Sequence, residues 1–177
     1  MTTDHDLGVR ILSGVPHTKS NKMDSQLKKN NANFIPLTPL SFLYRSKNIF
    51  PENIAWIYGK RKATYYEFYN RCKALALALK NTKIKNRDVV SVMLPNVPEM
   101  IEAHFGVPMS GAILNSLNTR LEKRSIEFIL KHSKSKVLIF HEDYKDLIQS
   151  LSKKLKIKLI LVNDVNNLKL KRIENYE

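Results

Sequence analysis

The sequence predicts an α/β fold in which an N-terminal helix and a β-hairpin precede a mainly parallel sheet. Three observations support this prediction. Two short β-rich runs flank a Gly-Lys turn, a capping box opens the helix that follows, and short apolar runs then alternate with amphipathic helical segments. Because strands that alternate with helices along a chain usually form parallel sheets, the third observation decides the fold class.

The first helix is expected to begin immediately after Thr38. A threonine can cap the free backbone N–H groups of a helix, and Pro39 suits the first turn because its ring fixes a helical φ angle. Apolar residues recur at helical spacing from Leu40 to Phe50, and Pro51 stops the helix.

A hairpin and a second helix follow. Ile54–Tyr58 is rich in β-branched and aromatic residues, and Gly59–Lys60 turn the chain into a short strand that ends at Thr64. Thr64 and Glu67 have the spacing of a capping box, in which each side chain accepts a hydrogen bond from the backbone N–H of the other residue. The helix that they open is expected to end near Lys80.

The second half of the chain has the pattern of a Rossmann-like βαβαβ sheet with right-handed crossovers. Asn96 and Glu99 are expected to cap the first crossover helix. Gly106 and Gly111 are expected to allow close approach where this helix meets the sheet. The expected strands are Val89–Leu94, Ala112–Leu117, Val137–Phe140 and Leu159–Val162. The expected helices run from Pro98 to about Gly111, from Glu122 to His132 and from Glu142 to Lys154.

The expected domain organisation has three parts. Residues 1–33 are polar, lack periodicity and are predicted to be a disordered tail, within which Met23 is an alternative start. Residues 34–162 are predicted to form a partial, incomplete subdomain. Residues 163–177 are polar and complete no further unit, so they are interpreted as the end of a fragment.

Charge and hydropathy exclude some classes of protein. The net charge is +14, but the basic residues are spread over expected loops and helix ends, and the aromatic residues fall on expected buried faces. Nucleic-acid binding is therefore the least favoured alternative. No apolar run approaches the roughly 20 residues of a membrane-spanning helix. The first 22 residues lack the apolar segment of a secretory signal, so a cytoplasmic protein is expected.

Cysteine and histidine supply no metal-binding pattern in this sequence. Cys72, the single cysteine, falls on an apolar helix face and is interpreted as a small buried residue. His104 has no second ligand at helical spacing and is expected to pack with one hydrogen bond. His132 and His141 are expected to be exposed.

The stretch Leu94–Leu121 carries the most information. It reads LPNVPEMIEAHFGVPMSGAILNSLNTRL and resembles the N-terminal subdomain of the AMP-binding, adenylate-forming enzymes, most of all their fatty acyl-CoA synthetase branch. Leu37–Phe42, Thr64–Phe68 and Val137–Ile139 resemble, in order, the opening helix, the early Thr-Tyr-x-Glu motif and the next strand of that branch. The resemblance covers about residues 33–162.

This resemblance implies an N-terminal fragment of an acyl-CoA synthetase. Complete members join a carboxylate to ATP and then pass the acyl group to CoA, so ATP, Mg²⁺ and CoA are the expected cofactors of the complete enzyme, and a medium- or long-chain fatty acid is its expected substrate. The phosphate loop, the later motifs and the C-terminal lysine of the family have no match here. No catalytic, cofactor-binding or metal residue is therefore assigned, and the chain alone is expected to be inactive.

Four polar residues are candidates for lining a substrate pocket. Asn115, Asn118, Thr119 and Arg120 lie at the carboxyl end of a predicted strand, and ligands bind at this edge in open α/β sheets. Asn and Thr also commonly hold loops and cap helices, and this structural interpretation is favoured. In the alternative, Arg120 lines a site that later sequence completes.

Two further hypotheses concern partners. The expected partner is the missing C-terminal remainder of the synthetase, covalently joined or separately encoded. In the second case the chain is a non-catalytic module whose uncovered sheet edge docks that remainder. Apolar sheet surface that the remainder would cover is expected to be exposed.

Overall fold

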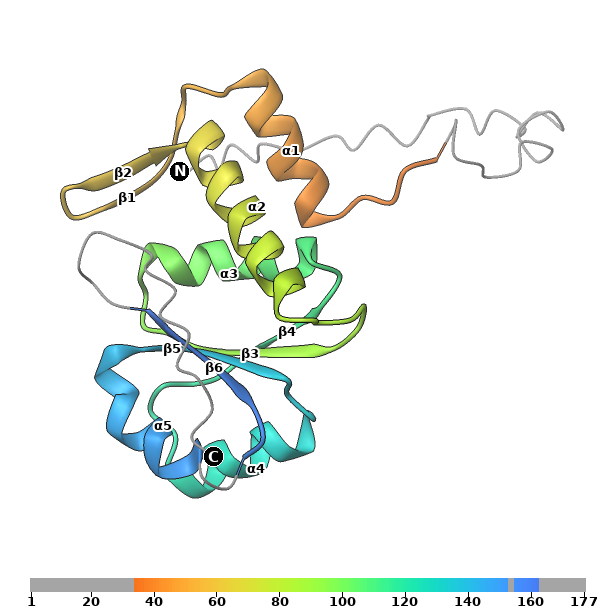
Figure 1. Ribbon diagram of the computed structural model, residues 1–177. Helices are drawn as coiled ribbons and strands as arrows, with labels where there is room; N and C mark the ends of the chain where they lie inside the picture. Colours follow the sequence, from red (N-terminus) through yellow and green to blue (C-terminus); the bar gives the residue numbers. More distant parts are fainter. Residues whose placement is uncertain (1–33, 153–154, 163–177) are drawn as a thin grey trace, which may run out of the picture. The chain divides into compact units, whose positions relative to one another are not determined.

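The computed structural model describes residues 34–152 and 155–162 (Figure 1). The chain divides into two units, Met1–Pro36 and Leu37–Glu177. All of the helices and strands below belong to the second unit. The predicted tail over residues 1–33 and the predicted fragment end over residues 163–177 lie outside the described residues.

The N-terminal elements follow the predicted order and have the predicted caps. Thr38 caps the first helix, where its side chain forms a reciprocal capping box with that of Ser41. Thr64 and Glu67 form the second box. The two short strands pair antiparallel, which confirms the hairpin. These elements are α1 (Pro39–Ile49), β1 (Ile54–Tyr58), β2 (Arg61–Thr64) and α2 (Tyr65–Asn81).

The remaining strands form one parallel sheet in the order β4-β3-β5-β6, as the alternating pattern predicted. The predicted last helix differs, because it begins as a 3₁₀ turn, η2 (Glu142–Tyr144), before α5 (Lys145–Ser152). The other elements are β3 (Val89–Met93), α3 (Pro98–Met109), β4 (Ile113–Ser116), α4 (Lys123–His132), β5 (Val137–His141) and β6 (Lys158–Val162).

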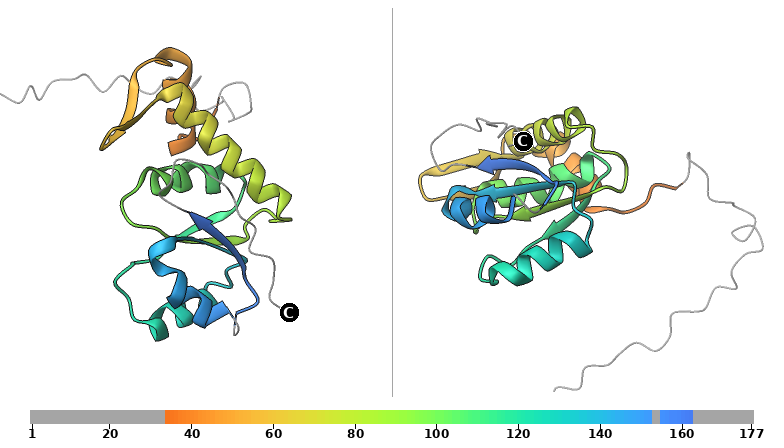
Figure 2. Two further views of the ribbon diagram at one scale, coloured as in Figure 1. Left: turned by 60° about the vertical axis from the view of Figure 1, so that its left-hand side comes forward. Right: turned by 60° about the horizontal axis from the view of Figure 1, so that its bottom comes forward.

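Helices cover both faces of this sheet (Figures 1 and 2). Val90 and Val92 of β3 pack with residues of α2 and α3 on one face, whereas Met93 packs with residues of α4 and α5 on the other. This division follows from the alternation of side chains along a strand. Such two-sided burial explains why the strands of the sheet read as nearly continuous apolar runs.

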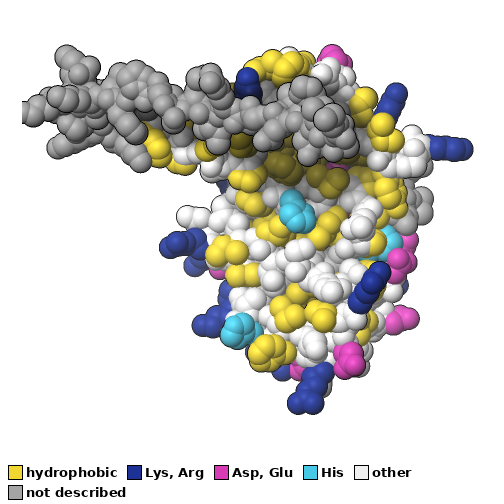
Figure 3. All heavy atoms as spheres, turned by 180° about the vertical axis from the view of Figure 1, so that it is seen from behind, with side chains coloured by type: hydrophobic (Ala, Val, Ile, Leu, Met, Phe, Trp, Pro, Cys, Tyr) yellow, Lys and Arg dark blue, Asp and Glu magenta, His cyan; other side chains and the backbone are white. Residues whose placement is uncertain are grey.

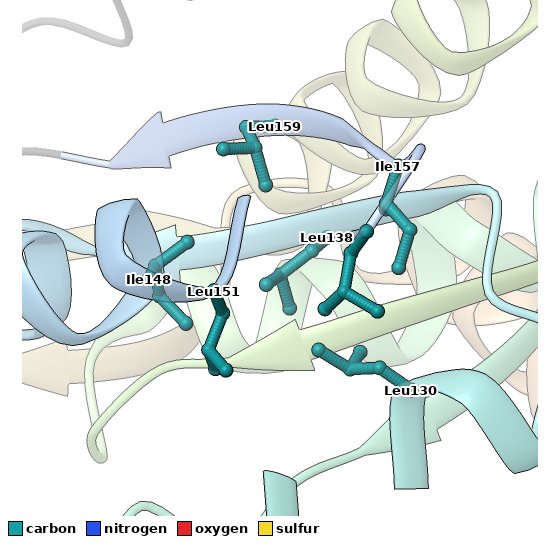
Figure 4. Close-up of a pocket in the computed structure, with 7 residues that line it drawn as sticks. Leu130, Leu138, Ile148, Leu151, Ile157 and Leu159 are labelled. Carbon is teal, nitrogen blue, oxygen red and sulfur yellow. The ribbon is translucent and has the colours of Figure 1, made fainter. Parts of the chain in front are cut away.

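The α4 and α5 face is closely packed. Leucine and isoleucine side chains from α4, β5, α5 and β6 point toward one another there (Figure 4). The gap that they leave is about 10 Å³, which is the space of roughly one water molecule. This face is therefore a core and offers no space for a substrate.

Two glycines serve different purposes. A Cβ atom on Gly106 would lie 2.9 Å from both the carbonyl oxygen of Cys72 and Cδ2 of Leu75, so this glycine lets α3 approach α2. The expectation that it allows approach to the sheet is wrong. Gly111 has a φ angle of +86°, which glycine adopts without strain in the turn before β4.

Candidate functional site

The strand order identifies the edge of the sheet at which a ligand site is expected. From β3 the chain crosses to β4 on one side and then returns to β5 on the other. In open α/β sheets, ligands bind outside the carboxyl ends of the strands where the order reverses in this way. The segments at this edge are the turns after β3, β4 and β5.

Asn115 lies within β4, near its carboxyl end, and takes part in a polar network inside the sheet. Its Nδ2 donates a hydrogen bond to Oγ of Ser91 on β3, at 2.9 Å. The hydroxyl of Ser91 lies 2.6 Å from that of Ser135, which in turn lies 2.7 Å from that of Ser133. Since Ser91 and Ser135 are buried, this network satisfies polar groups that would otherwise destabilise the core.

The other three sequence candidates form the turn after β4. The backbone N–H of Arg120 donates to Oδ1 of Asn118 at 2.9 Å, which is a local turn contact of the kind that asparagine commonly makes. Thr119 is half-buried, and the Arg120 side chain is exposed. The structure thus places all three beyond the carboxyl end of β4, and Asn115 on the strand itself.

His141 ends β5 at the same edge, and the prediction that it is exposed is wrong. Its side chain is buried, and Nδ1 lies 3.0 Å from Oδ2 of Asp143. No sequence motif marked this histidine. The available signal was its position at the end of an apolar strand, because the last residue of a buried strand shares the burial of its neighbours. His132 is exposed, as predicted.

A second group of charged side chains links the hairpin to the helices. Nη2 of Arg61, on β2, lies 2.7 Å from Oε1 of Glu99 on α3. Arg71, on α2, donates hydrogen bonds to both carboxylate oxygens of Glu102, and its Nη2 also lies 3.5 Å from Glu99. The prediction that Glu99 forms a cap with Asn96 is wrong, because Val97 is the N-cap of α3 and the Glu99 carboxylate pairs with arginines instead.

Burial sets the protonation properties of this charged cluster. Only 3% of the Glu102 side chain is exposed, whereas 33% of the Arg71 side chain is. Burial raises the pKa of Glu102, and the hydrogen bonds and charge of Arg71 oppose that rise only in part. Burial also raises the pKa of the neighbouring Cys72 thiol to about 12, so this cysteine stays protonated at neutral pH, in keeping with the predicted role as a buried apolar residue.

An apolar hollow lies beside this cluster. Its volume is about 160 Å³, which suits a molecule of roughly the size of benzene. Arg71, Glu99 and Glu102 supply its charged wall, and these groups already pair with one another. Each charged side chain of this wall therefore already has a partner of opposite charge. Its apolar lining consists of Ala74, Leu75, Leu94, Ala103, Ile139, Ile160 and Val162.

Neither a metal site nor a membrane segment is found in the described part of the chain. Residues 34–152 and 155–162 contain no group of three or more His, Cys, Asp or Glu side chains arranged to hold a metal ion. No helix in these residues has the length and apolar character needed to cross a membrane. The Nδ1 atom of His104 lies 2.8 Å from the carbonyl oxygen of Met100, which confirms one hydrogen bond, but the side chain is exposed rather than packed.

Comparison with known proteins identifies relatives of this chain. It is 39% identical over 143 residues to a peroxisomal butyrate–CoA ligase of Arabidopsis thaliana, a match that covers 77% of this chain and 25% of the relative. A peroxisomal benzoate–CoA ligase of the same plant is 47% identical over 116 residues, which is 66% of this chain and 20% of the relative. The chain therefore spans about a quarter or less of the length of these relatives.

The fold also matches solved structures. The o-succinylbenzoate–CoA synthetase of Bacillus subtilis, solved in complex with ATP and a magnesium ion, superposes with a TM-score of 0.60 at 25% identity. This match covers 68% of our chain and 32% of that one. The sequence model of the AMP-binding enzymes matches residues 43–176, which is most of the chain. The chain belongs to the AMP-binding enzyme family.

Proposed function

We propose that this chain is the N-terminal part of an ATP-dependent acyl-CoA ligase. The observation that supports this most directly is that the family match covers residues 43–176 and that relatives matching this region are named as CoA ligases. The four-stranded parallel sheet, with helices on both faces, is the framework expected for this role.

In the proposed reaction, the carboxylate of an acid attacks the α-phosphate of ATP. An acyl-adenylate forms and pyrophosphate leaves. The thiol of CoA then attacks the acyl carbon, giving an acyl-CoA and releasing AMP. ATP, Mg²⁺ and CoA are the cofactors proposed for the complete enzyme. None of them is assigned to residues of this chain, which has no match to the phosphate loop of the family.

The acid is proposed only as a class. Relatives named for butyrate, a short aliphatic acid, and for benzoate, an aromatic acid, match this region at 39% and 47% identity. This region therefore carries little of the information that distinguishes such acids. The medium- or long-chain fatty acid expected from the sequence, and the cytoplasmic location, both stay predictions. The two relatives carry names that place them in the peroxisome.

The four sequence candidates receive distinct roles in this proposal. Asn115 holds β4 to β3 through Ser91. Asn118 and Thr119 shape the turn after β4, and the exposed Arg120 is the member that can line a site completed by later sequence. This division follows from their burial and contacts, since a half-buried amide that is hydrogen-bonded within the sheet supports it, whereas an exposed guanidinium can reach a ligand.

Pyrophosphate exchange tests the proposal. The purified 177-residue chain should catalyse no carboxylate-dependent ATP–pyrophosphate exchange. The same chain joined to the following part of a CoA ligase should restore exchange for at least one acid in a panel that includes acetate, butyrate, benzoate and long-chain fatty acids. Exchange by the pure chain, or none by the joined protein with any acid, would contradict the proposal.

A separate, non-catalytic chain that docks an independently encoded remainder is the second candidate. The exposed apolar side chains of α1 and the hairpin offer a surface on which such a remainder could dock. The two candidates share the same enzyme and differ in whether the two parts are one polypeptide or two.

A further inference from the structure

Exposed apolar side chains are concentrated in one part of the second unit. Thirteen large hydrophobic side chains are exposed among its described residues, and nine of them lie between Leu37 and Tyr66. The other four, Leu77, Ile101, Ile113 and Phe128, are scattered over later elements. We call the nine the N-terminal apolar surface: Leu37, Phe42, Tyr44, Ile49, Phe50, Ile54, Ile57, Tyr58 and Tyr66.

Backbone hydrogen bonds hold the elements of this surface together. The N–H of Tyr66 donates to the carbonyl oxygen of Pro51 at 3.1 Å, and the N–H of Tyr65 donates to that of Asn53 at 2.9 Å. These bonds tie the link between α1 and β1 to the first turn of α2, so that Phe50, Ile54 and Tyr66 are neighbours. The surface is therefore built on hydrogen-bonded elements. Scattered exposed hydrophobic residues need no explanation, but a concentration of this kind marks an interaction site.

Basic side chains accompany the apolar ones. Residues 37–66 contain five Lys and Arg residues and a single acidic residue, Glu52. One of the five, Arg61, pairs with Glu99. From behind, hydrophobic side chains are visible at the top of the molecule and also over its middle and lower parts, and basic side chains lie at both edges (Figure 3). A complementary partner would have an apolar centre and an acidic rim. The other four basic residues are Arg45, Lys47, Lys60 and Lys62.

The hairpin points to a polypeptide as the partner. Among the described residues β1 and β2 form a sheet of only two strands, so one edge of each strand has no strand beside it. Two-stranded sheets are marginally stable in water, and an open edge accepts a further strand. A lipid surface would cover apolar side chains but would leave these backbone groups without partners.

We propose that the N-terminal apolar surface docks the part of the ligase that follows this region in its relatives. This inference rests on the proposed function. It commits to that polypeptide because the matched region is only about a quarter of the butyrate–CoA ligase, so most of the ligase lies outside it and is available to cover the surface. The contact would consist of aliphatic and aromatic side chains, with carboxylates at the rim and at least one strand beside the hairpin.

Binding of a defined probe tests this inference. The probe is the part of the Arabidopsis butyrate–CoA ligase that follows its matching segment, and the immobilised partner is the full 177-residue chain. Phe42→Lys on α1 and Ile57→Lys on β1 place a charge on the surface, at side chains that are 54% and 72% exposed. Each variant should weaken binding at least about tenfold, because burying an unpaired charge in an interface costs more than 1.4 kcal/mol.

Matched controls use equally exposed hydrophobic residues outside the surface. Leu77→Lys and Phe128→Lys replace side chains that are 53% and 65% exposed, and each should change the dissociation constant less than about twofold. Circular dichroism of every variant confirms folding. No binding by the unchanged chain, or an equal loss in the controls, would overturn the inference. Binding to anionic phosphatidylserine vesicles that the surface variants abolish, with no binding of the probe, would also overturn it.

The result is separable from the proposed function. A complex that forms through this surface but catalyses no pyrophosphate exchange with any acid would contradict the proposed ligase activity and support the docking surface. A complex that is active but insensitive to both surface variants would support the ligase and overturn the docking surface.

Discussion

The region from Leu37 to Tyr66 and the sheet region from Val89 to Val162 contrast in how they bury apolar side chains. In the sheet region helices cover both faces, and every residue of β5 is buried. In α1 only Leu43 is buried, and neither residue at the tip of β1, Ile57 or Tyr58, is covered. Similar hydrophobic content thus gives a closed core in one region and an open surface in the other.

The difference lies in the connections. Each crossover of the sheet brings its own helix, so successive strands and helices cover one another without help from outside. The hairpin has no such crossover, and the small core beneath it contains only three buried residues, Leu43, Phe68 and Cys72. Stability in the sheet region should therefore come from this chain, and stability in the N-terminal region should depend on further contacts.

The largest expected effect comes from the sheet. Phe140 on β5 is fully buried, and Phe140→Ala should lower the free energy of unfolding by about 3 to 5 kcal/mol, because it removes apolar contacts and leaves a cavity. Ile57→Ala in the hairpin should cost less than about 0.5 kcal/mol, since that side chain already faces water. Urea unfolding of the 177-residue chain measures both. Comparable losses of unfolding free energy in the two variants would show that the two regions do not differ in how they bury apolar side chains.

The charged cluster joins the two regions and should give a smaller effect. Arg71→Ala leaves the carboxyl of Glu102 buried without its two hydrogen bonds, and should cost about 2 kcal/mol. Arg61→Ala should lower the free energy of unfolding less than Arg71→Ala does, because the carboxylate of Glu99 still has Nη2 of Arg71 at 3.5 Å. Urea unfolding again gives the values. A larger loss for Arg61→Ala would show that the hairpin contact, rather than the contact between α2 and α3, dominates the cluster.

The pH dependence of Glu102 should be smaller still. Since burial raises the pKa of this carboxyl above its ordinary value of 4.5, the folded chain holds the proton more strongly than the unfolded chain does. The stability that the folded chain gains by holding this proton on Glu102 is therefore complete below pH 4.5, and it is lost as the pH rises through the pKa of Glu102 in the folded chain. Relative to Glu102→Gln, the unchanged chain should lose stability from pH 4.5 upward in urea unfolding. A relative gain over this range would mean that Arg71 outweighs burial.

The sequence predicted the elements well because their signals are local. The predicted N-cap Thr38 and the predicted capping box at Thr64 each act within a single turn, and the strands of the sheet are apolar runs bounded by breakers. The errors arose where tertiary contacts decide. Glu99 has a good capping position but pairs with Arg61, which lies 38 residues away, and Gly106 approaches α2 rather than the sheet.

The candidate site was less predictable for the same reason. The turn after β4 was placed correctly from the strand pattern, since a turn follows its strand in sequence. The bond of Asn115 to Ser91 depends on which strands are neighbours, and the burial of His141 depends on the helices that cover β5. Exposed apolar surface was expected on the sheet, whereas nine of the thirteen exposed large hydrophobic side chains in the described residues of the second unit lie between Leu37 and Tyr66.

Amide hydrogen exchange of the purified 177-residue chain, followed by mass spectrometry, tests the contrast between the two regions most directly. We expect slow exchange, at the rate of global unfolding, for the hydrogen-bonded amides of β3 and β5, and much faster exchange for those of β1 and β2, which form a two-stranded sheet over a small core. Protection of the hairpin equal to that of β5 in the isolated chain would contradict the account, because the N-terminal region would then be stable without any partner.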